Sequence, residues 1–549
     1  MRAGYLISFL VASIGLVQDA SAADESQRPN ILLIVADDLA ISDLGYMGSE
    51  IRTPNLDALA RRGVILDNFY VSPACSPTRA MLMSGVDNHR SGLGVMGESI
   101  MPEQRGRPGY EGYLNFKVHP LAERLRKAGY ATFMAGKWHL GAGDGQRPSD
   151  RGFDRSFALM EGGASHFSDA RGTSIHSLQV RYFDNGRQTK LPPDFYSSAF
   201  YTDRLIADIE ASLETRSARP FFAYAAYTAP HWPLQVPDDW LDRYVGMYDE
   251  GYEALAAQRL KRQIGLGRMV DTATPTPLPP HVKPWSALTP AQRRRESRAM
   301  EIYAAMVENL DHHIGRLIQR LKERGVYENT LVIFMADNGP EGNDVTLFRG
   351  HAEFLTRSGI DDTPENMGRV GSYVHYGPGW ATAAASPYRL YKAFTSEGGI
   401  RAPAFITWPA QIAAGRRHAF TVVNDIAPTL AELAGPEAME TPPELLAMDG
   451  ISLVPMLRHP GEALRAGEPH GWELFNRRAI RSGPWKATWF LPPYGPGRWQ
   501  LYHLRRDPYE RDDMAAKFPG KFRKMQKLWS EYARRNGVVE LDYDMDYDK

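Results

Sequence analysis

The sequence predicts a doubly wound α/β domain, in which helices flank a largely parallel sheet, followed by a smaller C-terminal α+β domain carrying a short antiparallel sheet. Three observations lead to this prediction. Four short apolar runs lack the alternation of half-exposed strands, and helical patterns precede most of them. Alternating helices and fully buried strands are typical of a doubly wound sheet. After about Gly435 the pattern changes to short, closely spaced strands.

The apolar runs and the helical patterns define the elements of the main domain. Each apolar run ends in polar residues, and the runs cover 30–36, 131–135, 221–227 and 330–336. Helical patterns cover 55–63, with Gly63 as the expected C-cap, 120–129, which begins with Pro and ends with Gly, and a long amphipathic stretch over 300–325.

The remaining segments set the expected domain limits. The proline-dense stretch 271–290 predicts an extended loop inside an insertion over roughly 236–298, and residues 340–390 predict irregular structure. Residues 474–489 and 499–504 predict short antiparallel strands, and 518–535 predict a terminal helix. We therefore expect a main domain over 23–435 and a C-terminal domain over 436–549.

The first residues indicate an export signal. Arg2 precedes an apolar run over 5–17, and Ala20-Ser21-Ala22 offers small residues for cleavage. The run is too short to span a bilayer comfortably, which disfavours the alternative of an uncleaved membrane anchor. We expect residues 1–22 to be a signal peptide and the protein to be exported, either periplasmic or secreted.

The composition excludes some classes of partner. The chain has 64 Lys and Arg against 65 Asp and Glu, a formal charge of −1, which gives no reason to expect binding to nucleic acid or to an anionic membrane. Nothing in the sequence marks an association surface, so a monomer is the default expectation. Cys75 is the single cysteine, so an intramolecular disulfide is excluded and an exported chain must rely on its core.

Polar residues follow all four predicted strands and predict one shared site. Ligands of open α/β sheets bind beyond the carboxyl ends of the strands. Those ends carry Asp37, Asp38, Lys137, His139, His231, Asp337 and Asn338. Three carboxylates at one point repel each other unless a cation neutralises them, and hard oxygen ligands select Ca²⁺ or Mg²⁺ over Zn²⁺. For either acidic pair alone, a helix N-cap or a turn is an equally good interpretation.

Lysine and histidine residues complete this predicted site. Lys137 and His139 are two residues apart, so they point the same way in an extended segment. Beside a metal and His231, they suit the binding of a tetrahedral oxyanion and the transfer of protons. Other histidines, at positions 89, 166 and 176, lie in polar loops, and we expect them to be surface residues.

The segment around Cys75 predicts the start of a helix. Ser76 can cap it, Pro77 fits its first turn, and Gly85 can end it. Position 75 then lies at the partially positive helix end, with Arg79 nearby, which favours an anion. A thiolate could act as a nucleophile there, whereas a lone cysteine is by default a buried, inert residue.

The segment from Cys75 to Arg79 matches the Cys-x-Pro-x-Arg signature of type I sulfatases, although Thr78 stands where the family most often has Ser. Further motifs occur in the family's order at Asp37-Asp38, 136–141, Pro230-His231, 337–339, 391–401 and 501–508. From Pro29 to about Asp512 the chain resembles this family, most closely bacterial secreted arylsulfatases. The resemblance implies an alkaline-phosphatase-like fold.

The resemblance also implies a modified cysteine and a bound cation. In the family, a formylglycine-generating enzyme oxidises the cysteine to formylglycine (3-oxoalanine), which is hydrated to a geminal diol. By resemblance, the cation is held by Asp37, Asp38, Asp337 and Asn338, with an oxygen of the modified residue 75 and the substrate sulfate. We favour Ca²⁺ over Mg²⁺, because many rigid carboxylate ligands leave little room for retained waters.

The catalytic roles follow from the same resemblance. One diol oxygen attacks sulfur, and Arg79 with the metal stabilises its alkoxide. Lys137, His231 and Lys392 hold the sulfate oxygens, and His231, together with Lys392, protonates the departing alcohol or phenol. The second diol hydroxyl loses its proton to His139, and the sulfate ester of residue 75 collapses to the aldehyde.

These observations predict a sulfuric ester hydrolase acting on aryl or related sulfate monoesters. A first alternative is a phosphonate monoester or phosphodiester hydrolase of the same superfamily, whose site overlaps heavily with this one. A second alternative, from a different class, is a non-catalytic oxyanion- or glycan-binding protein on a sulfatase scaffold. All of the expected metal-binding, Lys and His positions are present, which argues against a non-catalytic protein.

We expect Cys75→Ser, produced in a host that modifies only cysteine, to retain the fold and lose turnover. The reason is that a serine sulfate ester has no second hydroxyl with which to expel sulfate. Circular dichroism checks the fold, and release of a phenol from an aryl sulfate checks the turnover. Full activity of the variant would refute the formylglycine role.

Overall fold

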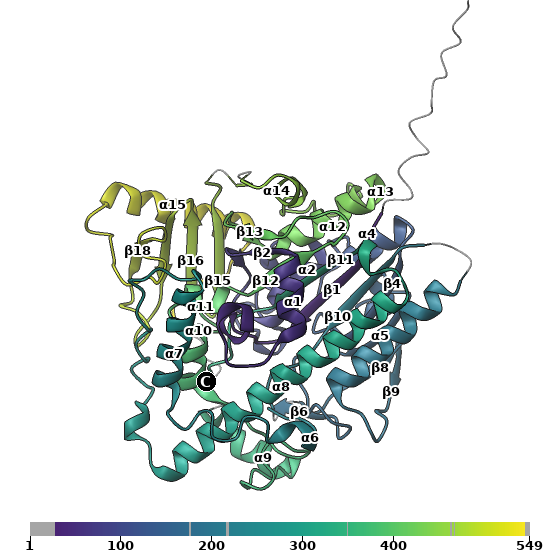
Figure 1. Cartoon of the computed structure of the whole chain (residues 1–549). Helices are drawn as coiled ribbons and strands as arrows, with labels where there is room; N and C mark the ends of the chain where they lie inside the picture. The colour runs from purple at the N-terminus through teal and green to yellow at the C-terminus, as the bar shows by residue number, and fades with distance from the viewer. Residues whose placement is uncertain are drawn as a thin grey trace, which may run out of the picture.

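Four parallel strands lie side by side at the centre of a large sheet flanked by helices (Figure 1). The computed structural model describes residues 28–543 apart from 175–176, 216–218, 348–349, 462–463 and 466. The sheet order runs β11, β1, β10, β4, and these are the four strands that the sequence predicts. Their bounds are β1 (Asn30–Ala36), β4 (Ala131–Lys137), β10 (Phe221–Ala226) and β11 (Thr330–Ala336). The predicted signal peptide over 1–22 and His176 lie outside the described residues.

The register of these strands brings their carboxyl ends together. β1 pairs with β11 from Asn30–Thr330 through Ala36–Ala336, so the residues that follow the two strands start level with each other. β10 pairs with β1 on its other side and with β4 beyond. All four strands are almost completely buried, which explains why their sequences do not alternate.

Outer strands make the ten-stranded sheet mixed. β5 (Arg155–Leu159) extends the parallel part beyond β4. Antiparallel pairing occurs toward both edges. The edge strands are β12 (Ala404–Thr407), β2 (Val64–Leu66) and β13 (Gly415–Arg417) on one side, and β8 (Tyr182–Asp184) and β9 (Arg187–Thr189) on the other. Two separate pairs form from β3 (Phe69–Tyr70) with β14 (Thr421–Val422) and from β6 (Arg171–Ser174) with β7 (Ser177–Gln179).

Helices cover both faces of the large sheet, as a doubly wound fold requires. One group packs together across the face toward the viewer in Figure 1 and consists of α1 (Pro54–Arg62), α5 (Ser197–Leu213) and α8 (Pro290–Glu323). A second mutually contacting group consists of α2 (Cys75–Ser84), α4 (Leu121–Lys127), α12 (Ile426–Ala434) and α13 (Pro436–Met439). The shorter or peripheral helices are α3 (Asn88–Ser91), α6 (Asp238–Leu241), α7 (Tyr252–Gly265), α9 (His351–Ser358), α10 (Gly377–Ala385), α11 (Glu397–Ile400) and α14 (Val454–Arg458).

Two helical regions differ from the sequence prediction. α8 begins at Pro290 and not at Met300, because Thr289 caps it and exchanges hydrogen bonds with Gln292. The stretch 340–390 is not irregular throughout, since α9 and α10 lie within it. α10 has Pro378 in its first turn and is rich in alanine, a residue that favours helix.

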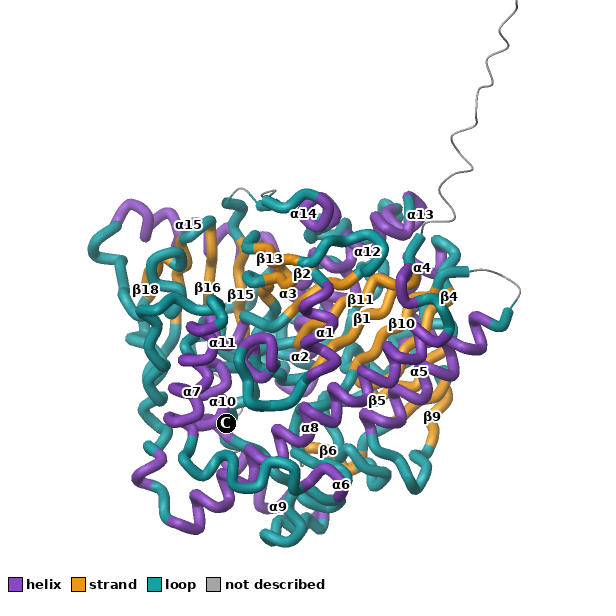
Figure 2. Tube along the Cα trace, in the orientation of Figure 1, coloured by secondary structure: helices purple, strands orange, loops and turns teal. Residues whose placement is uncertain are grey.

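A four-stranded antiparallel sheet and the terminal helix form the C-terminal part, as predicted (Figure 2). The strands are β15 (His470–Leu474), β16 (Arg477–Ser482), β17 (Trp485–Trp489) and β18 (Trp499–His503), and the helix is α15 (Pro519–Asn536). Apolar side chains of α15 pack on one face of the sheet. Trp472 and Ala479 pack instead against Tyr70 and Ile400, and so join the sheet to the main domain. In the described part of the chain, no helix combines the length and the apolar character that crossing a membrane requires.

His89 is a second tie between the two parts, and its burial corrects the expectation of a surface histidine. Its Nδ1 lies 3.2 Å from an oxygen of Asp87, and its Nε2 lies 3.2 Å from an oxygen of Glu473 on β15. Carboxylates only accept, so both ring nitrogens carry hydrogen. Burial alone would lower the pKa of His89, but the hydrogen bonds to Asp87 and Glu473 raise it to about 9. Tyr532 of α15 donates to the other oxygen of Asp87 at 2.8 Å.

We expect His89→Gln to lower the free energy of unfolding by about 3 kcal/mol at neutral pH, because two buried carboxylates lose their cation. The raised pKa makes this contribution complete below about pH 6.5 and removes it as the pH rises through about 9. Urea unfolding from pH 6 to 10 measures it, with His459→Gln, at an exposed histidine, as the control. A difference between wild type and His89→Gln that stays constant across this range would contradict the charged imidazolium.

Candidate active site

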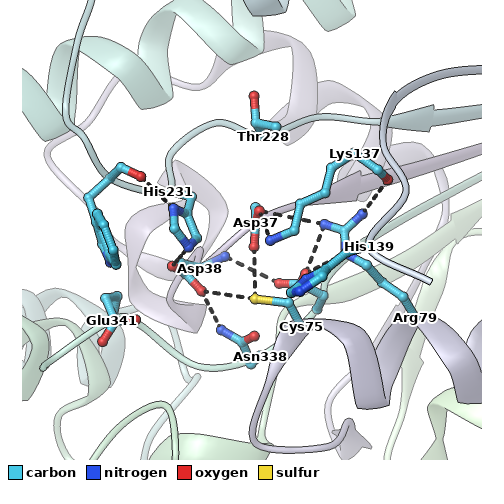
Figure 3. A network of polar contacts seen from close by, with 12 residues as sticks. Asp37, Asp38, Cys75, Arg79, Lys137, His139, Thr228, His231, Asn338 and Glu341 are labelled. Carbon is cyan, nitrogen blue, oxygen red and sulfur yellow. Dashed lines mark hydrogen bonds and ion pairs between the residues drawn. The ribbon is translucent and has the colours of Figure 1, made fainter. Parts of the chain in front are cut away.

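The ends of β1 and β11 bring together three carboxylates and the single cysteine. Ligand atoms of Asp37, Asp38, Cys75 and Asp337 all lie within 4.8 Å of one another (Figure 3). Strand alternation would send two consecutive side chains to opposite faces. Asp38 instead has a φ of 67°, a left-handed conformation that Asp tolerates, and both carboxylates of the Asp37-Asp38 pair serve the same cluster.

Cys75 is the first residue of α2, with Ala74 as the N-cap. The helix therefore begins earlier than expected, and Ser76 is not its cap. The hydroxyl of Ser76 is buried without a hydrogen-bond partner among the described residues. The Cys75 Sγ lies 3.3 Å from an oxygen of Asp37. Burial, and then the charge of Asp37, raise the pKa of the Cys75 thiol well above its usual value and so disfavour a thiolate.

Three buried cationic side chains pair with the carboxylates. Lys137, the last residue of β4, places its Nζ 2.5 Å from Asp37. Arg79, one turn into α2, donates its Nε to Asp337 at 2.9 Å and its Nη1 to the Lys137 carbonyl at 3.0 Å. Lys392 lies 2.9 Å from an oxygen of Asp38. These three side chains therefore balance much of the negative charge of the carboxylates.

Glu341 adds a fourth carboxylate that the sequence analysis missed. Its side chain lies 2.9 Å from the Lys392 Nζ, so this lysine bridges Glu341 and Asp38. The only sequence signal for Glu341 is its position directly after the Asp-Asn-Gly-Pro segment that ends at Pro340.

The electrostatics and the donor set both fit a hard divalent cation. Burial, and then the repulsion from Asp37, raise the pKa of Asp337 to about 6. Burial would also raise the pKa of Asp38, but Lys392, His231 and Lys137 lower it to about 2. Asn338 donates its Nδ2 to Asp38 at 2.6 Å, whereas its buried Oδ1 has no donor among the described residues. An oxygen-rich cluster with an unsatisfied amide oxygen is the donor chemistry that Ca²⁺ and Mg²⁺ prefer.

His231 approaches the cluster from the loop after β10. Its Nδ1 lies 2.5 Å from the Trp232 carbonyl, and because a carbonyl only accepts, the hydrogen of the neutral ring is on Nδ1. Nε2 therefore faces the site, 3.6 Å from Asp38. Burial lowers the pKa of His231 well below its usual value. His166, expected at the surface, is also buried, and its Nε2 contacts the His231 carbonyl at 3.0 Å.

His139 borders the cluster on the side of Arg79 (Figure 3) and contacts a residue that the sequence analysis missed. Its Nε2 lies 3.1 Å from Glu98, whose side chain is more than half exposed. Its Nδ1 is buried and has no hydrogen-bond partner among the described residues. Nothing in the sequence near Glu98 marks this contact, because the two residues meet only through the fold.

Two consecutive glycines pack against the two site histidines. A Cβ at Gly162 would lie 2.6 Å from the His139 ring, and a Cβ at Gly163 would lie 2.8 Å from the His231 ring. Gly136 is required for a different reason, since its φ is 123° and a Cβ would lie 1.8 Å from the Ala226 carbonyl. These positions let the backbone approach closely enough to carry Lys137 and both imidazoles into one cluster.

Comparisons with known proteins agree with this geometry. The family model described as Sulfatase matches residues 29–436. An arylsulfatase of Klebsiella aerogenes is 41% identical over 456 residues, covering 81% of this chain and 95% of that protein. A Schizosaccharomyces pombe protein described as an uncharacterized sulfatase is 42% identical over 535 residues, covering 95% and 96%. The chain therefore belongs to the sulfatase family, a family of hydrolases.

A solved structure gives the same fold. Ps i-CgsB, crystallised in complex with k-i-k-neocarrahexaose, is 25% identical and superposes with a TM-score of 0.66, covering 93% of this chain and 94% of that one. Against this background, Cys75 lies in a buried acidic cluster that is consistent with a formylglycine and a metal site.

We expect Ca²⁺ added to chelator-treated protein to raise the melting temperature, because the cation relieves the repulsion among the buried carboxylates. A hundredfold excess over Kd stabilises by about 2.7 kcal/mol. Asp337→Asn should lose this stabilisation. Asp311→Asn is the matched control, since Asp311 is also a buried carboxylate with a pKa raised to about 6, mainly by burial, but lies on α8 outside the cluster. An equal response of the two variants in thermal melts would argue against the site.

Proposed function

We propose that this protein is an arylsulfatase, which hydrolyses aryl or related sulfate monoesters to a phenol or alcohol and inorganic sulfate. The observation that carries the proposal is the position of Cys75, at the start of α2 and 3.3 Å from Asp37, inside a cluster of carboxylates and cations. The 41% identity with the Klebsiella aerogenes arylsulfatase supports the aryl substrate class. We propose that a formylglycine-generating enzyme converts Cys75 to formylglycine during maturation.

The proposed cation ligands are Asp37, Asp38, Asp337 and Asn338, together with residue 75 after its conversion. The Cys75 Sγ here stands in for an oxygen of the hydrated aldehyde. Four buried oxygen donors on rigid strand ends support Ca²⁺ over Mg²⁺, because Mg²⁺ usually retains several waters in its coordination sphere. When bound, the cation supplies positive charge that favours an ionised oxygen at position 75 and offsets the charge of the sulfate.

The cationic side chains are proposed to bind and orient the sulfate group. The hydrated aldehyde supplies two hydroxyl groups, one for attack on sulfur and one for the later expulsion of sulfate. Lys137 and Lys392 reach the cluster from different segments, with their Nζ atoms on Asp37 and Asp38, and can contact sulfate oxygens. Arg79 lies close to both Asp37 and Asp337 and stabilises negative charge at position 75.

The two histidines are proposed to move the protons. His231 presents Nε2 to the site and, once that nitrogen is protonated, can donate to the leaving oxygen, with Lys392 adjacent. His139 can accept a proton from the hydroxyl at position 75 through its buried Nδ1, while Glu98 holds its Nε2. Glu98 is thus proposed as a positioning residue that fixes the ring.

We also propose that the protein is exported, to the periplasm or the medium, on the basis of the sequence at its N-terminus. No nucleic acid or stable membrane association is part of the proposal. The proposed partner in the reaction is a small sulfate ester.

We expect kcat/KM for 4-nitrophenyl sulfate to exceed that for 4-nitrophenyl phenylphosphonate by at least about tenfold, or about 1.4 kcal/mol in activation free energy. A reversed order would favour the phosphonate and phosphodiester hydrolase. Absence of turnover on both would favour the non-catalytic binder, provided that the mass of the residue-75 peptide shows the aldehyde. Cys75→Ala is the control for background hydrolysis.

A further inference from the structure

A second cavity lies at the junction of the main domain and the C-terminal sheet. It has a volume of about 500 Å³ and is bounded by β3, by the segment following α11, and by β16. Figure 1 shows β15 and β16 beside the β13 edge of the large sheet, where this junction lies. None of the predicted site residues lines the cavity, so it is separate from the candidate active site.

The walls of this cavity carry an excess of positive charge. Its arginines are Arg268, Arg401, Arg465, Arg481 and Arg505, and its carboxylates are Glu397 and Glu468. Glu397 is already engaged, because one of its oxygens accepts from Lys486 at 2.8 Å and the other from the Tyr70 hydroxyl at 2.6 Å. Glu397 also lies 3.7 Å from Arg401, and Glu468 lies 3.5 Å from Arg465, but Glu468 is mostly exposed and solvent screens its charge. The cavity therefore favours an anion.

Aromatic rings hold two of these arginines in place. The guanidinium carbon of Arg481 lies 4.2 Å from the centroid of Phe420 and 4.9 Å from that of Tyr70. The guanidinium carbon of Arg401 lies 4.6 Å from the centroid of Tyr388 and 5.9 Å from that of Tyr70. Stacking fixes the plane of a guanidinium and leaves the N–H groups along its edge available for hydrogen bonding.

Three of the lining arginines keep an unused donor. Arg401 Nε, Arg465 Nε and Arg481 Nη1 are buried and have no acceptor among the described residues. The side chain of Arg465 is only 8% exposed, and its other end pairs with Asp425. Buried charged donors without acceptors are unfavourable unless a ligand or water completes them. The three arginines that carry these donors come from both parts of the molecule and all line the same cavity.

We propose that this cavity binds a tetrahedral sulfate group, either inorganic sulfate or the sulfate of an ester. Guanidinium groups match the geometry and charge of such an oxyanion through paired hydrogen bonds. Arg401 belongs to the main domain and Arg481 to β16, so one anion between them joins the two parts of the molecule. Binding should stabilise the protein independently of hydrolysis at residue 75.

The test compares Arg481→Gln with Arg478→Gln. Arg478 is on the same strand, three residues away and hence on the other face, where it stacks on Trp489 and pairs with Glu540. Isothermal titration of the full-length protein with sodium sulfate, at constant ionic strength held with NaCl, should give two sites in the wild type. Arg481→Gln should weaken one of them by about tenfold or more, whereas Arg478→Gln should leave both unchanged. Wild-type-like titration of Arg481→Gln would overturn the proposal.

A crystal soaked in selenate provides evidence that does not depend on any variant. We expect an anomalous peak between Arg401 and Arg481, and its absence at a concentration that saturates the solution site would also overturn the proposal. Titration of the Cys75→Ala variant with glucose 6-sulfate shows whether the ligand of this cavity is the free sulfate ion or a sulfate ester. Tighter binding than inorganic sulfate indicates an esterified ligand, and weaker binding indicates the free ion. Arg481→Gln should leave the proposed hydrolysis unaffected, because Arg481 is not part of the cluster at Cys75.

Discussion

The arrangement of the candidate site depends on an imbalance of buried charge at the ends of β1 and β11. Four carboxylates face three cationic side chains there, namely Asp37, Asp38, Asp337 and Glu341 against Arg79, Lys137 and Lys392. One negative charge is left over, and the pKa of Asp337 is raised, first by burial and then by the repulsion from Asp37. A divalent cation would turn the excess into a net positive charge, and an arriving sulfate group would then be attracted and not repelled. Charge balance therefore couples the binding of the substrate to the binding of the cation.

The C-terminal sheet contributes to this site although none of its residues enters it. Arg477 of β16 donates to the Ala393 carbonyl at 3.2 Å, and the Ala393 amide donates to the Pro73 carbonyl at 2.8 Å. These bonds fix the residue after Lys392 to the segment just before Cys75. Glu397 then anchors the following helix to Lys486 of β17. The small domain thus holds Lys392 at a fixed distance from residue 75.

Much of the site was predictable because most of its residues directly follow a predicted strand in the sequence. An apolar run followed by Asp-Asp or Asp-Asn identifies both the strand and the polar residues at its end, and the parallel register then brings those residues together.

Residues whose partners are distant in sequence were not predictable. The sequence places His89 at the surface, because its partner Glu473 is 384 residues away and the contact between them forms only in the folded chain. Glu98 lies in no motif, and it meets His139, 41 residues away in the sequence, only in the folded chain. The start of α8 was different, since Thr289, Pro290 and Gln292 were a readable cap that the amphipathic pattern obscured.

The environment of Cys75 suppresses the ordinary chemistry of a thiol. Burial, and then the charge of Asp37 at 3.3 Å, raise the pKa of the Cys75 thiol and favour its neutral form, which is a poor nucleophile and a poor ligand. Sulfur is also a soft donor, mismatched to the oxygen-rich cluster that surrounds it. An oxygen at the same position is a hard donor that matches the cluster. A hard cation bound by Asp37 and Asp337 would also favour its ionised form. The cluster is therefore better matched to an oxidised residue 75 than to the encoded cysteine, and this mismatch supports the proposed conversion to formylglycine.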